Sequence, residues 1–199
     1  MPVSMKRIFL LITFISITSS LLAAEIVDGY LISLSNDTVR CKIKVPKGFD
    51  LFHSFTDLFV KVSIMDSAGK TQTYKAKNQD INGFGFILDS NRYDYALKRT
   101  DDYGAASFLL IKETGKKLNL YYSYYYVSVN GGASYRTDVY LLEDAGKRIV
   151  RVSGGLFSAY KKKIREFLKE SPELLSIFER KVSSISDIPD FVREANQLL

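Results

Sequence analysis

Cysteine, histidine and tryptophan are almost missing from this 199-residue chain, which contains one Cys, one His and no Trp. The single cysteine, Cys41, cannot form an internal disulfide, so the fold must rest on packing alone. We expect Cys41 to be a small buried hydrophobe, with pairing to another chain as the alternative. One histidine and one cysteine also argue against a zinc site built from thiolate and imidazole ligands.

Sequence motifs of common catalytic sites are missing as well. A Ser-His-Asp or Cys-His site would have to use His53, which no nucleophile motif accompanies, so we expect a loop or surface histidine. The chain has no glycine-rich phosphate-binding or dinucleotide-binding motif and no EF-hand loop. Two carboxylates brought together in space are enough for a glycosidase, but the adjacent Asp101 and Asp102 are more simply explained by a loop. The sequence therefore favours a protein that is not an enzyme, and it indicates no cofactor.

The N-terminus shows the order of features of a secretory signal peptide. Lys6 and Arg7 form a short positive region, which is followed by the apolar run Ile8–Ile17 and by small and polar residues up to Ala24. The run is shorter than the ~20 residues that a membrane-spanning helix needs, so cleavage is favoured over an uncleaved anchor. We therefore expect residues 1–24 to be a signal peptide and the protein to be exported to the periplasm or the envelope, or secreted.

The exact start and cleavage site are left open by the sequence. Cleavage after Ala24 would place Leu22, rather than a small residue, at the −3 position. Met5 also opens a more typical signal than Met1 does.

The chain that remains after cleavage is mildly basic. Residues 1–24 hold two of the 28 basic residues and none of the 22 acidic ones, which leaves 26 basic and 22 acidic residues and a net charge of +4. In an exported protein this charge favours anionic envelope surfaces over nucleic acid as partners. The remaining length of about 175 residues is typical of one domain.

Residues 25–152 read as short strands joined by tight turns. Across residues 38–45, apolar and basic residues alternate with the period of two that is typical of a half-buried strand. We expect hairpin turns at Asn36–Asp37, Gly69 and Gly115, where glycine, Asn or Asp would supply positive φ angles. The second hairpin, which turns at Gly69, begins with a strand at 58–66. The third, which turns at Gly115, joins strands at 107–113 and 118–129. Such a series predicts an antiparallel sheet, curled or forming an open barrel.

Residues 153–199 change to a period of about 3.6, which predicts amphipathic helices. Ser171-Pro172-Glu173 has the form of a helix start, and Asp187 has the form of a helix cap. These helices are too short to be stable alone, so we expect them to pack on the sheet within one globular domain. The predicted fold class is therefore α+β.

Five tyrosines occupy six positions between Tyr121 and Tyr126. In a strand, Tyr122, Tyr124 and Tyr126 would share a face with core leucines, while Tyr121 and Tyr125 would share the other face. This second face is mixed, so Tyr121 and Tyr125 are candidates for an aromatic patch that binds an envelope protein or a glycan. The alternative is that all of these aromatics simply pack across the sheet.

A second candidate surface is the lysine run in the first predicted helix. Lys161, Lys162, Lys163 and Arg165 could direct this helix towards anionic lipid headgroups. The alternative is a solvated helix face with no partner.

Several phrases of the sequence resemble a known group of proteins. They are GYLISLSNDTVRCKI, YKAKNQDINGFGF, SFLLIKETGKKLNLYYSYYY, FSAYKKKIREFLKESPELLSIFERK and DIPDFVREANQ. Together they resemble exported, uncharacterised proteins that are common in Bacteroidetes-type bacteria. In this chain Ala195-Asn196 replaces the Tyr-Asn usual in that group, and Glu170-Ser171 stands where Asp-Cys is frequent. The resemblance implies export into a Gram-negative envelope and a β-rich domain with a helical tail, and it supplies no catalytic residue.

These observations lead to one main functional hypothesis and two alternatives. The main hypothesis is a non-enzymatic binding or scaffolding module of the cell envelope. The alternatives are a peripheral binder of membrane surfaces and, with least support, a carboxylate-based hydrolase.

Overall fold

The computed structural model describes residues 24–46, 55–99, 105–128, 134–153 and 159–198. Residues 1–23 of the predicted signal peptide, His53 and the Asp101–Asp102 pair lie outside these ranges. Within the described ranges, no helix is long and apolar enough to cross a membrane.

In the described ranges, ten antiparallel strands form an open sheet and three α-helices follow it, so the predicted α+β class is confirmed. The strand order is β10-β9-β8-β7-β6-β5-β1-β2-β3-β4, which leaves β10 and β4 as the two edges. By their internal contacts, residues 1–92 and residues 93–199 form two compact units. The prediction that the strands and helices make a single globular domain stays a prediction.

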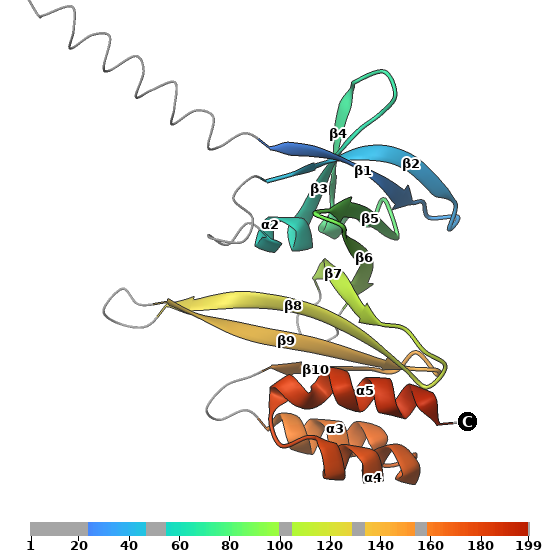
Figure 1. Cartoon of the computed structure of the whole chain (residues 1–199), viewed down its shortest axis with the longest axis vertical. Helices are drawn as coiled ribbons and strands as arrows, with labels where there is room; N and C mark the ends of the chain where they lie inside the picture. Colours follow the sequence, from blue (N-terminus) through green and yellow to red (C-terminus); the bar gives the residue numbers. More distant parts are fainter. Residues whose placement is uncertain (1–23, 47–54, 100–104, 129–133, 154–158, 199) are drawn as a thin grey trace, which may run out of the picture. The chain divides into compact units, whose positions relative to one another are not determined.

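The first unit contains the strands at the N-terminal side of the sheet (Figure 1). Its elements are β1 (Glu25–Ile32), β2 (Thr38–Val45), α2 (Phe55–Val60), β3 (Lys61–Met65), β4 (Thr71–Lys75), the 3-10 turn η1 (Ala76–Asn78), β5 (Gly83–Leu88) and the start of β6 (Asn91–Arg99). The turns predicted at Asn36 and Gly69 are confirmed, with φ angles of 67° and 79°.

Two elements of the first unit differ from the sequence-based expectation. Leu58–Val60, expected to begin a strand, belong to helix α2, and the strand begins only at Lys61. The hairpin of β5 and β6 was not predicted, although Asp89 and Ser90 form its two-residue turn with φ angles of 49° and 64°. Positive φ at both central residues is the geometry that joins two antiparallel strands most tightly.

The second unit contains the rest of the sheet and all three C-terminal helices (Figure 1). Its elements are the remainder of β6, β7 (Ala106–Glu113), β8 (Leu118–Ser128), β9 (Ser134–Asp144), β10 (Ile149–Ser153), α3 (Tyr160–Leu168), α4 (Pro172–Lys181), the 3-10 turn η2 (Ile185–Asp187) and α5 (Ile188–Gln197).

The helices bury their apolar faces against one face of this part of the sheet. The largest core cluster joins the two layers and includes Leu118, Leu120, Leu142, Val152, Ile164, Phe178, Phe191 and Val192. The rings of Phe178 and Phe191 meet edge to face with centroids 5.5 Å apart. Three helices that are each too short to be stable alone thus gain stability by packing.

The predicted helix starts are only partly confirmed. Pro172 does begin α4, but the side chain of Ser171 makes no capping hydrogen bond. Asp187 lies directly before α5, yet its carboxylate accepts hydrogen bonds from the backbone N–H groups of Ser183 and Ser184 and so closes the η2 turn. The hydroxyl of Ser183 also donates to it, and these bonds lower the pKa of Asp187 to about 2.

The side chain of Asn196 fastens α5 to the turn between β7 and β8. Its Oδ1 accepts from the N–H groups of Lys117 (3.2 Å) and Leu118 (2.9 Å), and its Nδ2 donates to the Leu118 carbonyl (2.8 Å). A Cβ on Gly115 would overlap the Asn196 amide. Gly115 is therefore needed for this close approach. The positive φ angle that the sequence led us to expect at Gly115 is not found.

Candidate functional site

Strand β8 presents the tyrosine run on two faces, as its period of two predicts. One face carries Leu118, Leu120, Tyr122, Tyr124 and Tyr126, and the other carries Asn119, Tyr121, Ser123, Tyr125 and Val127. All 11 residues of β8 pair in register with β9, from Leu118 opposite Asp144 to Ser128 opposite Ser134. Since residues directly opposite one another share a face, β9 determines the surroundings of each tyrosine.

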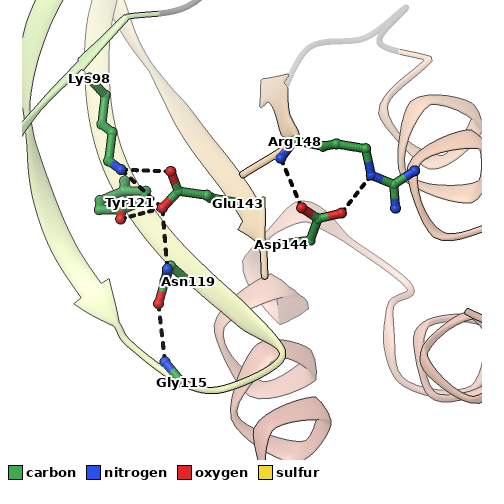
Figure 2. Close-up of polar contacts among 7 residues, drawn as sticks. All are labelled: Lys98, Gly115, Asn119, Tyr121, Glu143, Asp144 and Arg148. Carbon is green, nitrogen blue, oxygen red and sulfur yellow. Dashed lines mark hydrogen bonds and ion pairs between the residues drawn. The ribbon is translucent and has the colours of Figure 1, made fainter. Parts of the chain in front are cut away.

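Tyr121 lies in a buried polar network rather than at the surface (Figure 2). Its hydroxyl donates to Glu143 Oε2 at 2.7 Å, and Lys98 Nζ lies 2.7 Å from Oε1 and 2.9 Å from Oε2 of the same carboxylate. The Nδ2 of Asn119 donates to Glu143 Oε2 at 3.2 Å. The Lys98 ammonium also lies 4.4 Å from the centre of the Tyr121 ring. Only 5% of Tyr121 is accessible, so this residue packs within the sheet and does not contribute to an exposed aromatic patch.

The network stabilises one protonation state of Glu143 and one of Tyr121. Burial acts to raise the pKa of Glu143, but the hydrogen bonds from Lys98, Tyr121 and Asn119 outweigh it, so the pKa is lowered. Burial, followed by the hydrogen bond to Glu143, raises the pKa of Tyr121. Glu143 therefore stays ionised and Tyr121 stays protonated, which is the arrangement in which every hydrogen bond is charge-assisted.

Glu143 is the only buried acidic residue in the described part of the chain. Its oxygens are already occupied by the Lys98, Tyr121 and Asn119 donors. Among the described residues, no group of three or more His, Cys, Asp or Glu side chains is placed to hold a metal ion. No observation at this carboxylate favours the hydrolase hypothesis.

The far end of the same face has the opposite character. Tyr125 is 42% exposed and Tyr135, on β9, is 52% exposed, and no other described tyrosine is as exposed as these two. Tyr135 is directly opposite Val127, which follows Tyr125 on this face. We call Tyr125, Val127 and Tyr135 the aromatic patch. Sequence reasoning missed Tyr135, because the pairing that brings it beside Tyr125 cannot be read from β8 alone.

The helix-side face of β8 carries a ladder of tyrosines. The ring centroids of Tyr122 and Tyr124 are 6.1 Å apart, and those of Tyr124 and Tyr126 are 5.8 Å apart. Tyr122 is buried, as the core assignment predicted, but Tyr124 and Tyr126 are only half-buried. The Arg136 guanidinium lies 5.1 Å from the centre of the Tyr124 ring and is bound by Asp138 at 2.9 Å.

The basic residues of the lysine run in α3 lie in two different environments. Arg165 forms an ion pair with Glu179 of α4, and Lys161 contributes to lowering the pKa of the same carboxyl. Lys162 and Lys163 instead line a groove of about 730 Å³ beside β10, together with Arg148 and Arg151. The structure therefore brings together only two of the four residues predicted to meet an anionic surface, and it adds two arginines that sequence reasoning did not include.

Comparisons with protein-family models, curated proteins and solved structures found no match.

Proposed function

We propose that this chain is an exported cell-envelope protein that acts as a non-enzymatic binding module. Its contact surface is the aromatic patch at the far end of the β8–β9 hairpin. The observation that carries this proposal is the shared exposure of Tyr125 and Tyr135 on one face of paired strands. Tyrosine is enriched at the energetic centres of binding surfaces, because its ring buries much apolar area while its hydroxyl still forms a hydrogen bond.

The scaffold supports this role because the patch lies on regular strands. The continuous pairing of β8 with β9 fixes the backbone beneath Tyr125 and Tyr135. A side chain on such a backbone loses little conformational freedom when a partner binds, and this preserves affinity. The patch therefore resembles a preformed surface more than a loop that must order on binding.

The chemistry of the patch limits the kind of partner. Tyr125, Val127 and Tyr135 carry no charge, and Thr137, opposite Tyr125, is buried. On the other face of the same hairpin end, Arg136 stacks on Tyr124. The partner we propose is an envelope protein or glycan that offers a neutral apolar or hydroxyl-rich surface.

The test is a mild cross-linking pulldown of the tagged full chain from the envelope of the cells that produce it, read by mass spectrometry. We expect one reproducible protein or glycan partner, whose recovery falls about 30-fold or more in the Tyr125→Ser/Tyr135→Ser variant. The matched control is Val39→Ser, which removes an exposed apolar side chain from β2 and should leave recovery unchanged. Equal recovery by the double variant and the wild type would contradict the proposal.

A further inference from the structure

The groove beside β10 combines a basic rim with an apolar floor. Its rim carries Arg148 and Arg151 from the β10 side and Lys162, Lys163 and Lys169 from the α3 side. The acidic residues that line it are Glu166 and Glu170. Five cationic side chains thus face two carboxylates, which leaves a net charge of +3 among the residues that line the groove.

The acidic residues are already engaged by part of this positive charge. Glu166 pairs with Lys169 at 2.6 Å, and Glu170 pairs with Arg148 at 3.0 Å. Arg148 is further held by Asp144, whose Oδ2 accepts from its Nε at 2.6 Å (Figure 2). Its guanidinium also lies 5.5 Å from the centre of the Phe167 ring. Arg148 is therefore fixed in place. Lys169 and, to a smaller extent, Lys162 lower the pKa of the Glu166 carboxyl.

The floor of the groove supplies apolar surface next to these charges. Ile149 is exposed, and Val150 and Phe167 are half-buried within the same groove. A free phosphate ion would use only the cationic rim, whereas a phospholipid presents a phosphate directly beside acyl chains. The combination of rim and floor therefore fits an anionic phospholipid headgroup better than a small soluble anion.

We propose that the groove formed by Arg148, Arg151, Lys162 and Lys163 over Ile149 and Phe167 binds the phosphate of an anionic phospholipid headgroup. This inference is independent of the aromatic patch, so either proposal can fail without the other. It also differs from binding by a uniformly basic helix, because it assigns the contact to one side of α3 and requires an arginine of β10.

The test is sedimentation of the purified full chain with phosphatidylglycerol–phosphatidylcholine vesicles, with pure phosphatidylcholine vesicles as the reference. We expect binding to the anionic vesicles alone, weakening steeply above 0.1 M salt, where exposed charges are screened beyond ~10 Å. Lys162→Glu should weaken binding about ten-fold or more, and Arg151→Gln about five-fold, since each basic residue near an anionic surface contributes a factor of about five.

Lys161→Glu is the matched control, because it makes the same charge change at the adjacent position of the same helix but on the Glu179 side. We expect it to change binding by less than two-fold, with all variants melting at the wild-type temperature. An equal loss in Lys161→Glu and Lys162→Glu would overturn the groove in favour of a uniformly basic helix. Absence of sedimentation at low salt would also overturn it. Full competition by glycerol phosphate at the same phosphate concentration would assign the groove to a soluble anion and overturn the lipid assignment.

Discussion

Tyr121 and Tyr125 lie four residues apart on the same face of β8, yet their surroundings are opposite. Tyr121 donates its hydroxyl to the buried carboxylate of Glu143 and lies under the Lys98 ammonium. Tyr125 is exposed beside Tyr135 at the other end of the strand. One residue type in one periodic pattern therefore serves packing at one end and, in our proposal, recognition at the other. The difference arises from residues on other strands and not from β8 itself.

The largest difference between the two ends should appear when the charge balance of the buried end is broken. Glu143→Ala leaves the Lys98 ammonium, the Tyr121 hydroxyl and the Asn119 amide without their acceptor. We expect a loss of about 3 kcal/mol in the free energy of unfolding, because removing one partner of a buried ion pair leaves an uncompensated charge. Urea denaturation monitored by circular dichroism would measure it.

Two comparisons control this prediction. Lys98→Met/Glu143→Gln removes both charges while keeping an acceptor for Tyr121, so it should be less destabilised than Glu143→Ala. Glu179→Ala breaks the exposed ion pair with Arg165 and should have a much smaller effect. If Glu143→Ala unfolds at the same urea concentration as Glu179→Ala, the network does not stabilise the buried end.

The Asn196 contact gives a second measure of how firmly the buried end of β8 is held. Asn196→Ala removes three hydrogen bonds to the backbone of Lys117 and Leu118, and we expect a loss of about 2 kcal/mol in unfolding free energy. Gly115→Ala should destabilise by a comparable amount, because its new methyl group would overlap the Asn196 amide.

The two changes should not be additive. In Gly115→Ala/Asn196→Ala the overlap is gone, so the double variant should be more stable than the sum of the single effects implies. Additive losses would show that Gly115 is required for some reason other than its contact with Asn196.

Removing one hydroxyl group from each tyrosine compares their contributions to the unfolding free energy. Tyr121→Phe removes the donor to Glu143 and should cost about 1 kcal/mol. Tyr125→Phe removes a hydroxyl from an exposed ring and should change the unfolding free energy by less than about 0.5 kcal/mol. Equal effects in parallel thermal or urea melts would contradict the assignment of opposite roles.

Acid should weaken the buried end through Glu143. Its pKa is lower in the folded chain than the ordinary value of about 4.3, so its contribution is fully present above that value and is lost as pH falls through the lowered folded pKa. We expect the difference in unfolding free energy between the wild type and Glu143→Gln to shrink as pH falls from about 5 to the pKa of Glu143 in the folded chain. A difference that stays constant across this range would show that Glu143 does not titrate as described.

The sequence predicts the faces of β8 correctly because the side-chain period of a strand is fixed by its geometry. Exposure along one face is a different matter, since Tyr121 is buried by Glu143, which lies 22 positions away, and by Lys98 of β6. Tyr135 joins Tyr125 only through the β8–β9 register. A period within one strand contains no information about which strand pairs with it, so the fold class was predictable and the composition of the patch was not.

The lysine run shows the same limit for a helix. Its amphipathic period is matched by the burial of Ile164 and Leu168 in the core. It does not reveal that α4 would supply Glu179 on one side and that β10 would supply Arg151 on the other. The four residues proposed as one surface are therefore divided by their neighbours.

Site-specific photo-cross-linking within the producing cells would show whether the aromatic patch contacts a partner. Placing p-benzoylphenylalanine at position 125, at position 135 or at the control position 39 puts the cross-linking side chain at an exposed site in each variant. We expect irradiation to yield the same cross-linked partner from positions 125 and 135 and none from position 39. The absence of a common product from positions 125 and 135, in a chain that folds and melts normally, would contradict the aromatic patch as a binding surface.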